Sequence, residues 1–154
     1  MRTIREVAMG YLARREHSRQ ELALKLRKKQ FTVEEISACI DWLESKNYLC
    51  EHRFLSAYTR HRSEAGFGPR RIHAELMQRG IHASQVDSYW SSANIDWDKG
   101  CLIAWRKKFN QSPRDYKTMT QQTRFLLQRG FEPDRVQRLL QSIKEEADHE
   151  IHDN

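Results

Sequence analysis

The sequence predicts an all-α fold, built as an elongated, curved array of three tandem three-helix repeats. Apolar residues recur with a spacing of 50, and a fixed period of this size is typical of units that stack and bury one continuous core. The chain also has only three prolines and six glycines, and no segment alternates as a strand does. The equivalent sets are Leu26, Leu76 and Leu126; Phe31, Ile81 and Phe131; Ile36, Val86 and Val136; and Ile40, Trp90 and Leu140.

The first helix of each repeat carries an apolar pair four residues apart. The pairs are Val7 with Tyr11, Phe54 with Tyr58, and Cys101 with Trp105, and their spacing is 47 rather than 50. The connection to the second helix must therefore lengthen by three residues from one repeat to the next.

The second helix is predicted from its two ends. Ser18, Gly68 and Thr118 are 50 residues apart, and each suits the N-cap position. Glu21 follows Ser18 and Gln121 follows Thr118 at capping-box spacing, while Pro69 suits a first helical position. At the other end, Gly80 and Gly130 fit the left-handed position of a Schellman turn, where the first repeat has Gln30.

The third helix is predicted to begin near Thr32, His82 and Glu132. It follows an i, i+4, i+7 apolar stripe, which is Ile36, Ile40 and Leu43 in the first repeat. The predicted repeats are 1–48, 49–97 and 98–146, followed by an acidic C-terminal tail at 147–154. A lone unit of about 50 residues is only marginally stable, so each repeat is expected to depend on its neighbours.

Several classes of protein are disfavoured by what the sequence lacks. It has no apolar run of membrane-spanning length and no apolar signal region, and its three scattered cysteines favour a reducing cytoplasm over a disulfide framework. It also lacks the spaced metal-ligand, phosphate-loop and nucleophile-elbow motifs. We therefore expect a cytoplasmic protein that is not an enzyme and needs no cofactor or metal.

The charge distribution points to an anionic partner. The net charge is +6, but five acidic residues and no lysine or arginine lie between residues 145 and 153. The rest of the chain has 27 basic and 16 acidic residues, a balance that favours nucleic acid as partner. The alternative is that lysine and arginine simply solvate the helices.

Three arginines lie where helix electrostatics disfavour them. Arg19, Arg70 and Arg71 fall in the first turn of a second helix, where the macrodipole is unfavourable to cations and free N–H groups suit an anion. They could instead pair with acids of the preceding loop, such as Glu16 or Glu64. Two further basic clusters are Lys25, Arg27, Lys28 and Lys29, and Arg106, Lys107 and Lys108.

Several motifs resemble the RecX family of bacterial regulators of the RecA recombinase. They are His17-Ser18-x-x-Glu21-Leu22 with Lys25-Leu26; Tyr48-Leu49-x-x-x-Arg53-Phe54; Gly66-Phe67-Gly68-Pro69-x-Arg71-Ile72-x-x-Glu75-Leu76; and Phe125-Leu126-Leu127-x-Arg129-Gly130-Phe131. The resemblance covers nearly the whole chain. Two departures are Cys50 with Glu51, where the family usually has paired acids, and Ala65, where it commonly has lysine.

The resemblance implies a negative regulator of homologous recombination and DNA repair. Such a protein binds RecA filaments on single-stranded DNA and inhibits ATP hydrolysis, strand exchange and filament growth. We expect a monomer that touches RecA, and single- or double-stranded DNA as a further partner; the alternative is a helical-repeat protein that binds nucleic acid without a recombinase. The predicted partner- or DNA-binding residues are Arg19, Lys25, Lys28, Arg53, Arg70, Arg71, Arg79 and Arg129.

Overall fold

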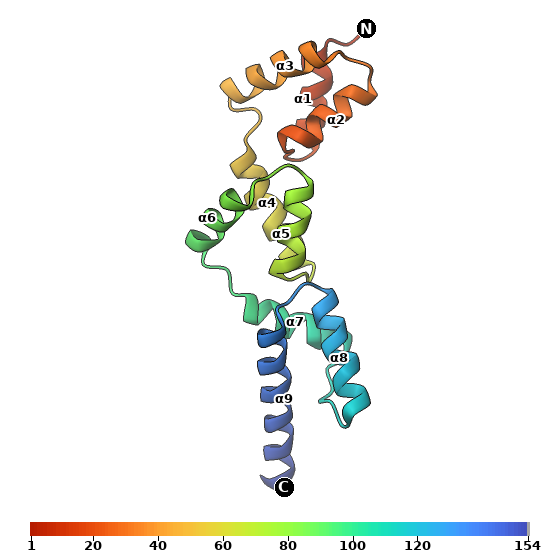
Figure 1. The fold of residues 1–154 in the computed structure, drawn as a ribbon, viewed down its shortest axis with the longest axis vertical. Helices are drawn as coiled ribbons and strands as arrows, with labels where there is room; N and C mark the ends of the chain where they lie inside the picture. The colour runs from red at the N-terminus through yellow and green to blue at the C-terminus, as the bar shows by residue number, and fades with distance from the viewer. Residues whose placement is uncertain (154) are drawn as a thin grey trace. The chain divides into compact units, whose positions relative to one another are not determined.

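The structure, a computed structural model, describes the backbone of residues 1–153 and the side chains of residues 1–151, and this part of the chain is helical without any strand (Figure 1). The prediction of an all-α fold of three three-helix repeats is confirmed. The nine helices of the described residues are α1 (Ile4–Arg14), α2 (Arg19–Lys28), α3 (Val33–Ser45), α4 (Glu51–Glu64), α5 (Pro69–Gln78), α6 (Ala83–Ala93), α7 (Trp97–Lys108), α8 (Tyr116–Gln128) and α9 (Pro133–Asp153).

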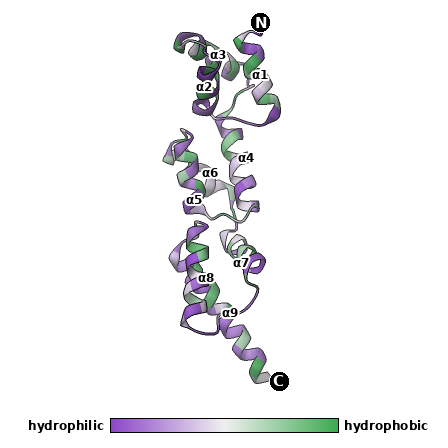
Figure 2. Cartoon of the chain, turned by 90° about the vertical axis from the view of Figure 1, so that its right-hand side faces the viewer, coloured by the Kyte–Doolittle hydropathy of each residue, from purple (hydrophilic) through white to green (hydrophobic). Residues whose placement is uncertain are grey.

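The helices form two compact units, and the middle repeat contributes to both. The first unit contains residues 1–59 and 75–92, and the second contains residues 60–74 and those from Ala93 onward. The helices mix hydrophobic and hydrophilic residues along their length, as α8 and α9 show in Figure 2. The repeated apolar positions lie in the cores: Leu26, Leu76, Leu126, Val86 and Val136 are all fully buried.

Side-chain caps begin the helices largely where the sequence predicts them. Ser18 is the N-cap of α2 and forms a reciprocal capping box with Glu21. Pro69 is the first residue of α5, and the Thr32 hydroxyl accepts a hydrogen bond from the Glu35 N–H at 3.1 Å. These contacts satisfy N–H groups that have no partner inside a helix.

All three second helices end in the predicted Schellman turn. The N–H of Phe31, Ile81 and Phe131 donates to the carbonyl of the leucine five residues earlier, at 3.4, 3.1 and 3.2 Å. Gln30 adopts a φ of 71°, in the same left-handed region as Gly80 and Gly130. The hydrogen bonds and the buried Leu26 therefore hold this turn even without glycine.

The prediction that Thr118 caps the third copy is wrong. The N-cap is Asp115, and α8 begins three residues earlier than predicted, at Tyr116. The Asp115 carboxylate accepts from the Thr118 N–H at 2.9 Å, while the Thr118 hydroxyl accepts from the Asp115 N–H at 3.1 Å. Thr118 thus closes a capping box from inside the helix, and part of the longer connection in this repeat is helical.

The acidic residues near the C-terminus lie on a helix. Helix α9 continues through the predicted tail to Asp153, and Asn154 lies outside the described residues. Among the described residues, no helix combines the length and apolar character needed to cross a bilayer.

In both units, the N-terminus of one second helix meets the C-terminal turn of the next. In the first unit, the hydroxyl of Ser18, the N-cap of α2, donates to the Arg79 carbonyl at 2.7 Å. In the second unit, the N–H of Gly68 donates to the Arg129 carbonyl at 2.7 Å, and the N–H of Arg70 donates to the Gly130 carbonyl at 2.9 Å. We call each of these contacts a helix-end joint. In both, a carbonyl that follows one helix accepts a hydrogen bond from a group at the start of another, a side-chain hydroxyl in the first unit and backbone N–H groups in the second.

The joint in the second unit leaves no room for a side chain at Gly68. A Cβ there would lie 2.5 Å from the Gly130 carbonyl carbon, whereas a Cβ on Gly10, in α1, would meet nothing within 4 Å. We expect Gly68→Ala to lower the free energy of unfolding by roughly 1–3 kcal/mol through overpacking. Gly10→Ala should raise it by about 0.5–1 kcal/mol, because alanine favours the helix. Urea unfolding of both variants checks this, and equal effects would contradict the close approach.

A buried histidine makes the first unit sensitive to acid. His17 is 1% exposed, with Nδ1 3.0 Å from the Arg15 carbonyl and Nε2 2.8 Å from the Lys25 ammonium. Since the ammonium can only donate, Nε2 accepts and the ring is neutral. Burial is the main reason why the pKa of His17 lies below its ordinary value.

We therefore expect stability to fall on acidification. The unfolded chain, with the higher histidine pKa of about 6.5, binds a proton there before the folded chain does, so this contribution is fully present above that pH and is lost as pH falls through the lowered folded pKa. Urea midpoints between pH 7.5 and 5 measure the effect. His17→Gln, although less stable at pH 7.5, should show a flatter pH dependence; parallel curves would assign the effect to other groups.

Candidate functional site

Three of the predicted site arginines in the first unit already bind partners within it. Arg19 forms ion pairs with Glu44 and, at 3.3 Å, with Asp41, both on α3 rather than in the preceding loop as one interpretation expected. Its side chain therefore holds α2 against α3.

The side chains of Arg53 and Arg79 also contact partners within the first unit. The Arg53 guanidinium donates to Glu16 at 3.0 Å and to the backbone carbonyl of Asn47 at 2.8 Å. Arg79 lies 3.5 Å from the Glu21 carboxylate, and its guanidinium carbon is 4.9 Å from the centre of the Tyr58 ring. These contacts give both arginines a structural role.

Lys25 is only partly available, and Lys28 is exposed. Lys25 contacts His17 and lies 4.9 Å from the centre of the Tyr11 ring, and its pKa is lowered, chiefly by burial and then by the nearby Arg15. Of the predicted residues in the first unit, Lys28 alone is exposed and forms no ion pair among the described residues.

In the second unit, three arginines surround one aromatic ring. The guanidinium carbons of Arg62, Arg71 and Arg129 lie 3.9, 4.4 and 4.6 Å from the centre of the Phe67 ring. We call these four residues the Phe67 cluster. The turn after α4 positions the ring, since Gly66 has a φ of 96° and the Phe67 N–H donates to the Arg62 carbonyl at 3.1 Å. Cation–π contacts of this kind fix guanidinium groups without neutralising them.

The helix-end joint brings Arg129 to this cluster, and Arg70 lies beside it. Arg129 makes no ion pair among the described residues, and Arg70 is exposed and likewise unpaired there. Arg71 and Arg129 of this cluster are among the residues predicted from the sequence to bind a partner, whereas Arg62 and Phe67 are not. The Gly66-Phe67-Gly68 turn was the available signal, but only the joint shows that residue 129 returns to it.

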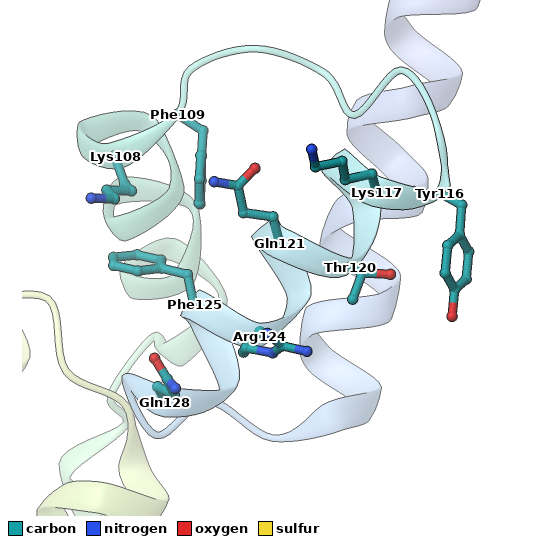
Figure 3. Close-up of a pocket in the computed structure, with 9 residues that line it drawn as sticks. All are labelled: Lys108, Phe109, Tyr116, Lys117, Thr120, Gln121, Arg124, Phe125 and Gln128. Atoms are coloured by element: carbon teal, nitrogen blue, oxygen red, sulfur yellow. The ribbon is translucent and has the colours of Figure 1, made fainter.

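Two hollows extend the basic surface of the second unit. A small pocket of about 130 Å³ is lined by Ala65, Gly66, Ala104, Lys107, Lys108, Phe125 and Arg129. A larger groove of about 600 Å³, the α7–α8 groove, is lined by Lys108, Phe109, Tyr116, Lys117, Thr120, Gln121, Arg124, Phe125 and Gln128 (Figure 3). The two share Lys108 and Phe125, and no carboxylate lines either of them. Such a surface can hold phosphates or an acidic protein face.

The structure shows what surrounds the two departures from the motif pattern, Cys50 with Glu51 and Ala65. Cys50 precedes α4, and its carbonyl accepts the Phe54 N–H at 3.1 Å, while the Glu51 carboxylate accepts from the Arg19 N–H at 3.1 Å. Glu51 therefore links two repeats even though its usual acidic neighbour is missing. Ala65 lines the small pocket together with Lys107, so cations of α7 lie near the position where the family commonly has lysine.

No metal centre is evident in the described part of the chain, where no group of three or more potential ligands comes together.

Comparison with known proteins shows to which family the chain belongs. The first, second and third three-helix domains of RecX match residues 5–43, 51–88 and 101–140 in turn. The chain belongs to the RecX family. The resemblance found in the motifs is thereby confirmed.

Relatives and solved structures agree with this assignment. The chain is 44% identical to the regulatory protein RecX of Pseudomonas putida (strain W619) over 138 residues, which cover 89% of this chain and 88% of that protein. It is 42% identical to that of Pseudomonas entomophila over 89% of each. The crystal structure of RecX from Lactobacillus salivarius matches the fold with a TM-score of 0.76 at 21% identity, over 91% of this chain and 94% of that one. The RecX family is thus a family of regulatory proteins with this three-repeat fold.

Proposed function

We propose that the protein is a negative regulator of the RecA recombinase. It binds RecA filaments on single-stranded DNA and inhibits ATP hydrolysis, strand exchange and filament growth. Membership of the RecX family, through all three of its three-helix domains, is the observation that carries this proposal.

The basic surface of the second unit supports a role in binding. Arg129 and Arg70 form no ion pair among the described residues, and the backbone of both takes part in the joint between α5 and α8. Charges on the rim of an interface mainly speed association and set its orientation, and they act on an acidic protein face as well as on phosphates.

A second candidate function is direct binding of nucleic acid without a recombinase. It is favoured by the α7–α8 groove, which combines three cations with three aromatic rings. The two functions differ in what they require: direct binding should occur on bare DNA and weaken steeply with salt as counterions are released.

The proposed function predicts inhibition of the ATP hydrolysis that the host RecA performs on single-stranded DNA. A titration beginning well below one protein per RecA subunit measures it. Inhibition at low ratios would indicate action at filament ends, and inhibition near equal amounts would indicate binding along the filament. Undiminished hydrolysis at saturating protein would contradict the proposal, and salt-sensitive binding to bare DNA would then favour the second function.

Reversing Arg70 and Arg71 together to glutamate should weaken inhibition without unfolding the chain. Residue 71 is the repeat equivalent of Glu21, which lies beside Arg79 in the other joint, so a glutamate there has a precedent beside Arg129. Exposed charge pairs contribute roughly 0.2–1 kcal/mol each, so the loss of two should raise the protein needed for half-inhibition by about two- to thirtyfold. Arg2→Glu with Lys29→Glu makes the same change in net charge in the first unit. Equal effects of both double variants would remove the Arg70–Arg71 pair from the site.

A further inference from the structure

The side chain of Arg129 is held by two aromatic rings. Its guanidinium carbon lies 4.6 Å from the centre of the Phe67 ring and 5.0 Å from that of Phe125, which projects from α8 towards the end of α7 (Figure 3). The backbone is fixed as well, because the Arg129 N–H donates to the Phe125 carbonyl at 3.0 Å and its carbonyl accepts from Gly68 in the joint. Since Arg129 forms no ion pair among the described residues, its charge is held in place without being neutralised.

This guanidinium lines the small pocket at the turn after α4. The walls are largely apolar, since Ala65, Ala104 and Phe125 line the pocket and Gly66 adds no side chain. Two lysines of α7 bring further positive charge, and no carboxylate of the chain lies in the lining. The volume of about 130 Å³ is well below the roughly 300–1,000 Å³ of pockets that hold a small-molecule ligand, so the pocket suits one side chain and is too small for a nucleotide.

We propose that this pocket receives the side chain of one glutamate or aspartate from a protein partner, with its carboxylate paired to Arg129 and its methylene stem against the apolar walls. A guanidinium whose face lies on a ring still presents its N–H edge, and this edge binds a planar carboxylate through two parallel hydrogen bonds. Because the rings and the joint order the arginine before the partner arrives, binding costs less side-chain entropy. The inference rests on the proposed function, in which the partner is RecA, and adds the chemical group that the partner supplies.

Phe67 acts as a positioning residue for this contact. A ring holds a cation without supplying an opposite charge. In the other joint, by contrast, the carboxylate of Glu21 lies beside Arg79, the repeat equivalent of Arg129. The arginine of the first joint therefore already has a carboxylate partner within the chain, whereas the arginine of the second joint remains available to a carboxylate from outside.

The first test fills the pocket without changing any charge. Ala65 is exposed at the pocket, so Ala65→Leu should keep the fold and occupy the space meant for the partner's side chain. Half-inhibition of RecA ATP hydrolysis should then need about ten times more protein or above, as expected when hydrogen bonds to a charged group are lost. Ala38→Leu makes the same change at an exposed position of α3 in the first unit and should leave inhibition unchanged. Urea midpoints of both variants would exclude a loss of stability as the cause.

The second test distinguishes a carboxylate from a phosphate and contains no RecA. Fluorescence anisotropy at low salt would follow the binding of a short polyglutamate peptide and of a thymine oligonucleotide. Arg129→Lys, which keeps the charge but loses the planar fork, should weaken peptide binding by about tenfold and oligonucleotide binding much less. Phe67→Leu should also weaken peptide binding, whereas Phe67→Tyr should retain it, because a ring again holds Arg129.

The inference is wrong if folded Ala65→Leu inhibits hydrolysis as the unchanged protein does, or if Phe67→Leu and Phe67→Tyr bind the peptide equally. Equal loss of peptide and oligonucleotide binding in Arg129→Lys would also overturn it and assign Arg129 to phosphates. Failure of the proposed function gives a different result: the unchanged protein would then leave RecA hydrolysis undiminished. In that case the peptide assay would still show whether the pocket takes a carboxylate.

Discussion

The helix-end joint is the contact on which the rest of the structure depends. A helix leaves N–H groups unpaired at one end and carbonyls unpaired at the other, and these ends carry opposite partial charges. Where the N-terminus of α5 meets the C-terminal turn of α8, the hydrogen bonds of Gly68 and Arg70 pair two N–H groups of one end with two carbonyls of the other. Repeats of about 50 residues are only marginally stable alone, so this pairing of backbone groups between repeats adds to apolar cores that lie within the first and the third repeat.

The same joint gives opposite electrostatics in the two units. In the first unit, Arg79 follows α5 and lies beside the Glu21 carboxylate. Burial raises the pKa of Glu21, but hydrogen bonds from Arg15 and the Ser18 N–H outweigh it and leave that pKa below the ordinary value. In the second unit the equivalents of Arg79 and Glu21 are Arg129 and Arg71, and both lie on the Phe67 ring. A single position, glutamate in one repeat and arginine in the next, thus turns a structural ion pair into part of a cationic surface.

The repeated features, helix caps and core positions, could be predicted from the sequence. The contacts that the helix-end joints bring about between distant residues could not. Caps and core positions repeat, so Ser18, Pro69 and the three buried leucines were predictable, and even the turn at Gln30 followed from its neighbours. The predicted N-cap of α8 was wrong because Thr118 can take part in a capping box either as the N-cap or as the third helical residue, which is its position here. Arg19 and Arg53 bind acids more than 20 residues away, so charge alone could not reveal that they are occupied. Arg62 and Phe67 join Arg129 only through the joint, a contact across more than 60 residues that no local pattern encodes.

The position of the cationic surface on a joint also couples its charge to the packing of repeats. Guanidinium groups on one ring are like charges at close range, and a cation–π contact contributes about 0.5–1 kcal/mol at an exposed site. A joint built for stability alone would be expected to resemble the first one, with Glu21 facing Arg79. An anion that binds the folded surface would relieve the repulsion and stabilise the packing of α5 on α8 by mass action. The first joint thus has an ion pair where the second has arginines on an aromatic ring, and only the second is expected to gain stability when an anion binds.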